Sequence, residues 1–345
     1  METFRPDMIV EWIPYNNFQN IKYLTKGGCS EIYTAIWTDG PYNEWDFKEH
    51  LLKRFGSKEV ILKGLGNIMS SCSWYEEAKS HLTISNKWAS IVHCYGLTQD
   101  PSNKDYILVM LKMDMDLRNY LRQNHNQLTW EGRIQITIDI INALYRIHLE
   151  NAIHRDLHSG NILYSQLNQR FCISDLGFCG PAGKQLKGLY GNLPYTAPEV
   201  IIGKEHTFAS DIYSIAILMW EISSGQPPFM NYEHDYDLAM NIVNGIRPKI
   251  VSEIPLEYKN LMEQCWDADP LKRPDTFKIL KKMDEINLNY QKIPIHRLEA
   301  NINLKINELS DLKVNYTSNT NKIYQFPEPR NATEGINIYN LFINF

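Results

Sequence analysis

Two regions of the chain differ in the spacing of their apolar residues. From residue 18 to about residue 111 these residues come in short runs typical of β-strands, separated by turn signals, at 18–24, 31–37, 46–55, 91–97 and 106–110. One helix is predicted at 74–84, after a serine-rich run that supplies its N-cap. We therefore expect a β-rich unit with one main helix.

Beyond Lys112 the apolar residues follow a helical period. The segment 130–150 places apolar side chains on one face at spacings of three and four, and the segment 210–223 is apolar enough to be buried on nearly all sides. A β-rich part followed by a helix-rich part predicts an α+β fold of two lobes. Small ligands usually bind in the cleft between such lobes.

From about Asn287 onward the chain is rich in asparagine and poor in large apolar residues. One amphipathic helix is predicted around residues 298–309, and after Asn315 no period remains, which favours a loop or a partly disordered tail. We therefore expect an N-terminal flank at 1–17, a folded domain at 18–285 with lobes at about 18–111 and 113–285, and a tail at 286–345. The tail is a candidate for binding a protein partner.

Bulk composition narrows the class of protein. Hydrophobic residues make up 43% of the chain and charged residues 22%, as in globular proteins. The net charge of −5 argues against a nucleic-acid partner. The six cysteines form no C-x-x-C pair, which argues against a zinc site and favours a reducing compartment, the cytoplasm or the nucleus. No signal peptide and no membrane-spanning run is recognisable.

Three motifs follow one another in the second region: His154-Arg155-Asp156-Leu157-His158-Ser159-Gly160-Asn161, then Asp175-Leu176-Gly177, then Ala197-Pro198-Glu199. In their order and spacing they resemble the catalytic loop, the Asp-Phe-Gly element and the end of the activation segment of the protein kinase family. The resemblance spans about residues 18–284. It implies a two-lobed kinase fold that binds ATP and Mg²⁺ and phosphorylates a protein substrate.

The resemblance assigns a role to each residue at a matching position. Asp156 would accept the proton of the substrate hydroxyl, and Asn161 and Asp175 would hold Mg²⁺ through oxygen ligands. Lys53, at the end of an apolar strand, would contact the nucleotide phosphates and pair with Glu77 on the predicted helix. Lys63 competes with Lys53 for this role, although its glycine-flanked position favours a turn. Glu76 competes with Glu77, and only one of them can face the lysine.

The predicted phosphate-covering loop departs from the family pattern. Gly27 matches the middle glycine, whereas Thr25 and Ser30 stand at the outer glycine positions. By resemblance the nucleotide site would include Gly27, Gly28, Ile32, Lys53 and Met113, although Met113 is equally well explained as a core residue. Leu51 stands where the family has a small alanine against the adenine ring. These departures favour an alternative hypothesis, a pseudokinase that binds nucleotide and acts as a scaffold.

Further residues indicate the kind of kinase. Trp220-Glu221, Pro227-Pro228-Phe229 and Cys265-Trp266 resemble the tyrosine-kinase-like group, whose members mostly phosphorylate serine and threonine. His158 replaces the usual lysine of these enzymes and Asn192 the usual threonine, so a dual-specificity or tyrosine kinase remains an alternative. Tyr190 is a candidate phosphorylation site, with no such site as the other possibility. Structural roles follow for Asp211, as a brace of the catalytic loop, and for Glu199 with Arg273, as a buried ion pair.

Overall fold

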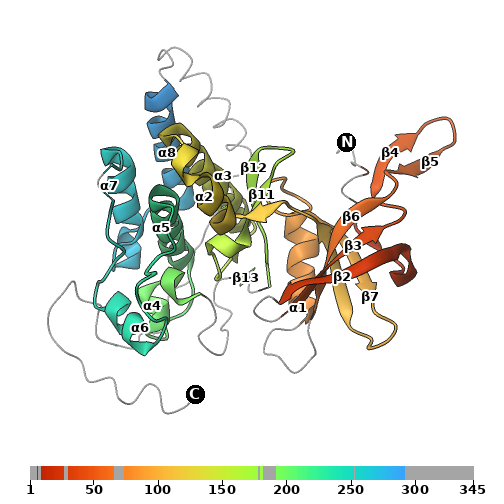
Figure 1. Cartoon of the computed structure of the whole chain (residues 1–345), viewed down its shortest axis with the longest axis horizontal. Coiled ribbons are helices and arrows are strands. Elements are labelled where there is room, and N and C mark those ends of the chain that lie inside the picture. The colour runs from red at the N-terminus through yellow and green to blue at the C-terminus, as the bar shows by residue number, and fades with distance from the viewer. Residues whose placement is uncertain are drawn as a thin grey trace.

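The computed structural model of the protein describes residues 6, 9–26, 30–65, 74–177, 179–181, 192–251 and 253–291. A lobe of β-strands and a lobe of helices lie side by side (Figure 1). The strands of the first lobe are β1 (Glu11–Trp12), β2 (Phe18–Lys26), β3 (Glu31–Trp37), β4 (Tyr42–Asp46), β5 (Leu51–Arg54), β6 (Lys58–Gly64), β7 (Cys94–Gln99) and β8 (Tyr106–Leu111). Its helix α1 (Trp74–Ser80) continues as a π-helical turn at His81–Ser85.

The main sheet of the first lobe has the strand order β1-β7-β8-β6-β3-β2. Side chains alternate across each strand, so the sheet carries an apolar cluster on each face. One cluster includes Val60 and Leu62 of β6 with Trp37 of β3. The other includes Ala78 of α1 and Leu108 and Met110 of β8, so it joins the helix to the sheet. Helix α1 is thereby fixed against the face that also presents Lys63.

Strand β1 lies in the region that the sequence predicts to be a flank. It runs parallel to β7, with Glu11 opposite Gly96, and the amide of Ile13 donates to the carbonyl of Leu97 at 2.8 Å. Gly96 has a φ of +150°, and a Cβ there would lie 1.9 Å from the Glu11 carbonyl oxygen, so only glycine permits this approach. Ile13 is 1% exposed and belongs to the apolar cluster around Trp37.

The predicted strand at 46–55 is wrong in its extent. The chain forms a separate two-stranded hairpin from β4 and β5, which projects from the lobe (Figure 1). The central strand β6 follows it and pairs with both β3 and β8. Lys63 therefore lies in a strand and not in the turn that its glycine neighbours suggest.

The second lobe consists mainly of helices, and the predicted helices at 130–150 and 210–223 are confirmed by α3 (Trp130–Leu149) and α5 (Phe208–Ser224). Helix α3 contacts both α5 and α8 (Thr276–Gln291). Thr207 and Ser210 form a capping box at the start of α5, and Gly225 ends it in the left-handed conformation. The remaining helices are α2 (Leu117–Asn124), α4 (Pro198–Ile201), α6 (Tyr236–Val243) and α7 (Leu256–Cys265).

Short strands after the first lobe form two small sheets and carry the loops of interest. They are β9 (Met115–Asp116), β10 (Ala152–Ile153), β11 (Ile162–Ser165), β12 (Arg170–Ile173) and β13 (Gly180–Pro181). The predicted two-lobed α+β fold is thus confirmed, while the exact domain limits stay predictions. The predicted helix at 298–309 and the rest of the tail from 292 lie outside the described residues. Of the helices that the structure describes, none has the length and apolar character to cross a membrane.

Candidate active site

Lys63 is the centre of a charged cluster between the two lobes. Its Nζ lies 2.7 Å from Glu77 Oε1 on α1 and 2.6 Å from Asp175 Oδ1 after β12. The Lys63 and Glu77 side chains are 8% and 10% exposed, so water screens their attraction little. The lysine therefore ties the sheet and the helix of the first lobe to a loop of the second.

The electrostatics of this cluster favour the charged forms of Lys63 and Asp175. Burial alone lowers the pKa of Lys63, but the Asp175 and Glu77 carboxylates outweigh it, and the pKa is raised above its ordinary value. Burial likewise raises the pKa of Asp175, and Lys63 outweighs this effect, so the pKa of that carboxyl lies well below its usual range. The cluster presents one ammonium group that is held in place by two carboxylates.

The prediction that Lys53 pairs with Glu77 is wrong. Lys53 lies on the projecting hairpin, where its Nζ forms an ion pair with Asp46 at 2.7 Å and the side chain is 50% exposed. The competing residue Lys63 occupies the position beside the helix because β6, and not β5, is the strand in the middle of the sheet. Of the two candidate glutamates, Glu77 makes the contact, as predicted.

The same shift corrects the prediction for Leu51, which is 47% exposed on the hairpin and lies away from the cleft. The residue two positions before the paired lysine is Ile61, which lies opposite Met110 of β8. Ile32 lies opposite Lys63 in the sheet, so this predicted nucleotide contact is next to the cluster. Gly27 and Gly28 lie outside the described residues.

Met113 lies between β8 and β9, where the chain passes from one lobe to the other. Its half-buried side chain contacts the apolar cluster that contains Met110 and Leu108. This contact agrees with the alternative that Met113 is a core residue. Its backbone, which the resemblance implies for adenine binding, nevertheless lies in the connector.

The catalytic-loop motif connects β10 to β11 and is held by its own side chains. The Asn161 amide Nδ2 donates to the Asp156 carbonyl oxygen at 2.9 Å and lies 3.4 Å from Asp156 Oδ2. The buried His154 accepts from the amide of Asp156 at Nδ1, at 3.3 Å, and its Nε2 donates to the carbonyl of Ser174 at 3.1 Å. These bonds fix Asp156 and Asn161 next to the segment that carries Asp175.

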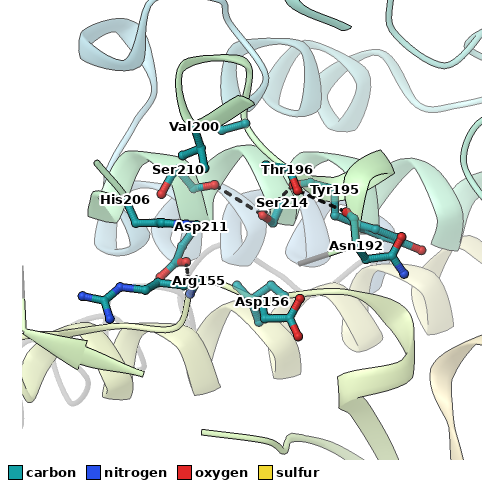
Figure 2. Close-up of a pocket in the computed structure, with 12 residues that line it drawn as sticks. Arg155, Asp156, Asn192, Tyr195, Thr196, Val200, His206, Ser210, Asp211 and Ser214 are labelled. Carbon is teal, nitrogen blue, oxygen red and sulfur yellow. Dashed lines mark hydrogen bonds between the residues drawn. The ribbon is translucent and has the colours of Figure 1, made fainter. Parts of the chain in front are cut away.

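Asp211, at the start of α5, accepts two backbone bonds from this loop. Its Oδ2 accepts from the amide of His154 at 2.8 Å and its Oδ1 from that of Arg155 at 2.9 Å, which confirms the predicted bracing contact. Arg155 has a φ of +72°, a strained conformation that these bonds help to hold. Figure 2 shows the small pocket that Arg155, Asp156 and Asp211 line together with residues of the Ala-Pro-Glu segment, which are Asn192, Tyr195, Thr196, Ala197 and Val200. Asp156 thus lies beside the segment that ends in the Ala-Pro-Glu motif.

A histidine that the sequence reasoning missed joins α1 to the Asp-Leu-Gly segment. His81 is 1% exposed, and its Nε2 accepts from the amide of Leu176 at 3.2 Å. Burial and the nearby Lys63 charge lower the pKa of His81 to about 3, so the imidazole is neutral and can accept this bond. Its position four residues after Glu77, one helical turn on, is the signal that could have identified it.

A second ion pair stabilises the helical lobe away from the cleft. Arg273 binds Glu199 with two parallel bonds of 2.7 and 2.8 Å, and the side chains are 0% and 4% exposed. The predicted pair is therefore confirmed. Because Glu199 belongs to the Ala-Pro-Glu motif, the pair fixes the end of the segment that leads to the pocket near Asp156.

The chain matches the family model of protein tyrosine and serine/threonine kinases over residues 18–283. This match confirms the resemblance, and the chain belongs to the protein kinase family. It is 26% identical over 294 residues to the probable serine/threonine-protein kinase roco7 of Dictyostelium discoideum. This match covers 81% of this chain and 10% of roco7. It is 29% identical over 289 residues to the dual specificity protein kinase zakA of the same organism. This match covers 79% of this chain and 32% of zakA.

A third relative is the dual serine/threonine and tyrosine protein kinase of Homo sapiens, 35% identical over 172 residues, with coverage of 49% of this chain and 18% of the relative. The names of these relatives are consistent with the tyrosine-kinase-like group. The chain spans between 10% and 32% of the length of the three relatives.

Proposed function

We propose that this chain is an active protein kinase that transfers the γ-phosphoryl group of ATP to a protein hydroxyl, with serine or threonine as the favoured acceptor. The observation that carries the proposal is the cluster of Lys63 with Glu77 and Asp175 beside the loop of Asp156. Phosphoryl transfer depends on positioning and charge neutralisation, and this arrangement supplies both. Family membership supports the proposal.

Each residue of the cluster has a role in the proposed step. Lys63 binds the phosphates of ATP and Glu77 holds the lysine. The acceptor oxygen forms a bond to the γ-phosphorus while the bond from that phosphorus to the bridging oxygen of ADP breaks. Asp156 receives the proton of the acceptor hydroxyl. Burial raises the pKa of Asp156, but the adjacent His158 outweighs it and the pKa is lowered, so the carboxylate is ready to accept this proton.

The donor set fits ATP-bound Mg²⁺. Asn161 donates through Nδ2 to the Asp156 carbonyl, which leaves its amide oxygen available, and Asp175 supplies a carboxylate. Such oxygen ligands suit a hard cation. Asp175 has a φ of +53°, a conformation that the Gly177 amide helps to hold by donating to Oδ1 at 3.1 Å. Mg²⁺ would neutralise charge on the phosphates, and Asn161 and Asp175 would hold it.

The experiment is Mg²⁺-dependent phosphorylation of a generic protein acceptor, with Asp156→Ala as the comparison. We expect turnover by the unmodified chain, loss of that turnover in Asp156→Ala, and phosphoserine or phosphothreonine in the product. Kinases usually turn over at about 1–100 s⁻¹, so even a strongly impaired enzyme is measurable. Equal silence of both proteins, with ATP binding retained, would favour the pseudokinase scaffold, for which Thr25, Ser30 and Ile61 are the supporting residues.

The cellular setting follows as part of the same proposal. A cytoplasmic kinase is supported by the scattered cysteines, and a protein partner for the tail by the amphipathic pattern at 298–309. Phosphotyrosine in the product would instead favour the dual-specificity or tyrosine alternative.

A further inference from the structure

His158 occupies a place beside the proposed base that neither the family role nor the ion-pair cluster explains. It follows Asp156 by two residues, and its Nε2 lies 3.6 Å from Asp156 Oδ2. The two side chains are 20% and 14% exposed, so the imidazole shields the carboxylate from solvent. Catalytic hydrogen bonds are often long before substrate binds and tighten when it does, and this separation is consistent with such a bond.

The orientation of the His158 ring is fixed from its other side. His158 caps the 3₁₀ turn Ser159–Asn161, and its Nδ1 accepts from the amide of Gly160 at 3.1 Å. Because Nδ1 accepts, the proton of the neutral ring is on Nε2, which faces Asp156.

Gly160 also makes room for the ring. A Cβ at this position would lie 2.9 Å from His158 Cε1 and 3.0 Å from Nδ1, closer than side chains normally approach. The φ of Gly160 is not in the left-handed region, so the need for glycine here comes from the imidazole and not from the backbone. The absence of a side chain at residue 160 therefore allows the His158 ring to take this position.

The two oxygens of the Asp156 carboxylate have different surroundings. Oδ2 faces His158 Nε2 and also lies 3.4 Å from Asn161 Nδ2. Oδ1 has no hydrogen-bond partner among the residues that the structure describes. One oxygen is thus covered by N–H donors, while the other is left to meet an acceptor hydroxyl.

We propose that His158 is a positioning residue for phosphoryl transfer, whose Nε2–H holds Oδ2 of Asp156 so that Oδ1 faces the acceptor hydroxyl. This inference rests on the proposed kinase function. The residue donates through a ring nitrogen, in contrast to the ammonium group of the lysine that serine/threonine kinases usually have at this position. The carboxylate is oriented by the ring, and the positive charge near the phosphates comes from Lys63.

The test compares kcat, the KM for ATP and Tm in the unmodified chain, His158→Ala, Gly160→Ala and the double variant. A misplaced base costs up to about 100-fold, so we expect kcat to fall about 10- to 100-fold in His158→Ala, with the KM for ATP unchanged and Tm lowered slightly by loss of the cap on the 3₁₀ turn. Gly160→Ala should lower kcat by displacing the ring, and should have no further effect once His158 is alanine. His234→Ala, a change of an exposed histidine on the helical lobe, is the matched control and should leave kcat unchanged.

The outcomes separate this inference from the proposed function. If the unmodified chain is active and His158→Ala keeps its kcat within about twofold, the positioning role is wrong and the kinase proposal stands. If Gly160→Ala lowers kcat by the same factor in the unmodified chain and in His158→Ala, the positioning role is also wrong. This comparison of ratios holds even if His158→Ala folds poorly. Absence of turnover in the unmodified chain overturns both proposals.

Discussion

Two lysines of the first lobe form ion pairs of nearly the same length in very different surroundings. On the projecting hairpin, Lys53 lies 2.7 Å from Asp46 and is half exposed. In the central strand, Lys63 lies 2.7 Å from Glu77 and 2.6 Å from Asp175 and is almost fully buried. Water screens the first pair and hardly reaches the second. Distance alone therefore does not identify the functional lysine, whereas burial and a second carboxylate do.

The largest effect is expected for Lys63→Met, which removes the shared cation of the buried cluster. Glu77 and Asp175 then lose their partner, and removal of one member of a buried pair costs about 3–5 kcal/mol of unfolding free energy, here at the lower end because Asp175 is partly exposed. Turnover should fall at least about 100-fold, since a positioned charge on the reacting group is lost. Phosphorylation assays and urea unfolding measure the two effects, and near-normal turnover would contradict the assignment.

Glu77→Gln sharpens the comparison by removing one of the two carboxylates. Lys63 keeps its bond to Asp175, so we expect the unfolding free energy to fall by only about 1.5–3 kcal/mol, the usual value of a hydrogen bond to a charged group. The KM for ATP should rise because the lysine is less firmly held. The matched control is Asp46→Asn on the hairpin, and equal effects of the two changes would show that burial does not separate the pairs.

Arg54→Met tests the base of the hairpin, which is intermediate in burial. Arg54 binds Glu11 through two bonds of 3.1 and 2.7 Å and donates to the carbonyl of Gly40 at 2.7 Å, and its guanidinium lies over the Tyr42 ring. Loss of these contacts should lower the unfolding free energy by about 1–2 kcal/mol without changing kcat. A kcat that falls together with stability would indicate that the hairpin takes part in catalysis.

The smallest effect is expected for Lys53→Met, although the sequence predicts this residue to be catalytic. Its ion pair is exposed, so Tm and turnover should both match those of the unmodified chain. Measured beside Lys63→Met, this variant provides the direct contrast between the two lysines. Loss of turnover in Lys53→Met alone would restore the assignment made from the sequence.

The candidate site residues that local motifs identify lie close together in the chain, and their roles stay predictions. Asp156, Asn161 and Asp175 belong to two neighbouring motifs, so their mutual placement depends on the short segment between them. The long helices were also predictable, because Thr129 caps α3 and Thr207 and Gly225 bound α5. The helical period and these caps agree with each other, and local sequence then determines local structure.

The residues that were predicted poorly depend on strand register. Gly64, the last residue of β6, follows Lys63 directly and resembles a turn signal. The hairpin of β4 and β5 supplied an apolar run with a lysine near its end. Which strand lies at the centre of the sheet is decided by pairing with β3 and β8, partners distant in sequence. Strand β1 was missed because two residues are too few to show the alternation of apolar and polar side chains that is typical of a strand.

The parallel strand β1 has a consequence for where the folding unit begins. A fragment cut at Phe18, where the family match starts, would lack Ile13 and the Glu11 carboxylate. The apolar surface around Trp37 and Val60 would then be exposed to water, and Arg54 would lose its ion-pair partner Glu11. Strand β7 would become an unpaired edge of the sheet at Leu97. Such a fragment should aggregate or unfold at a lower temperature than the longer chain. We therefore expect the cooperative folding unit to start upstream of residue 18, where the family match begins.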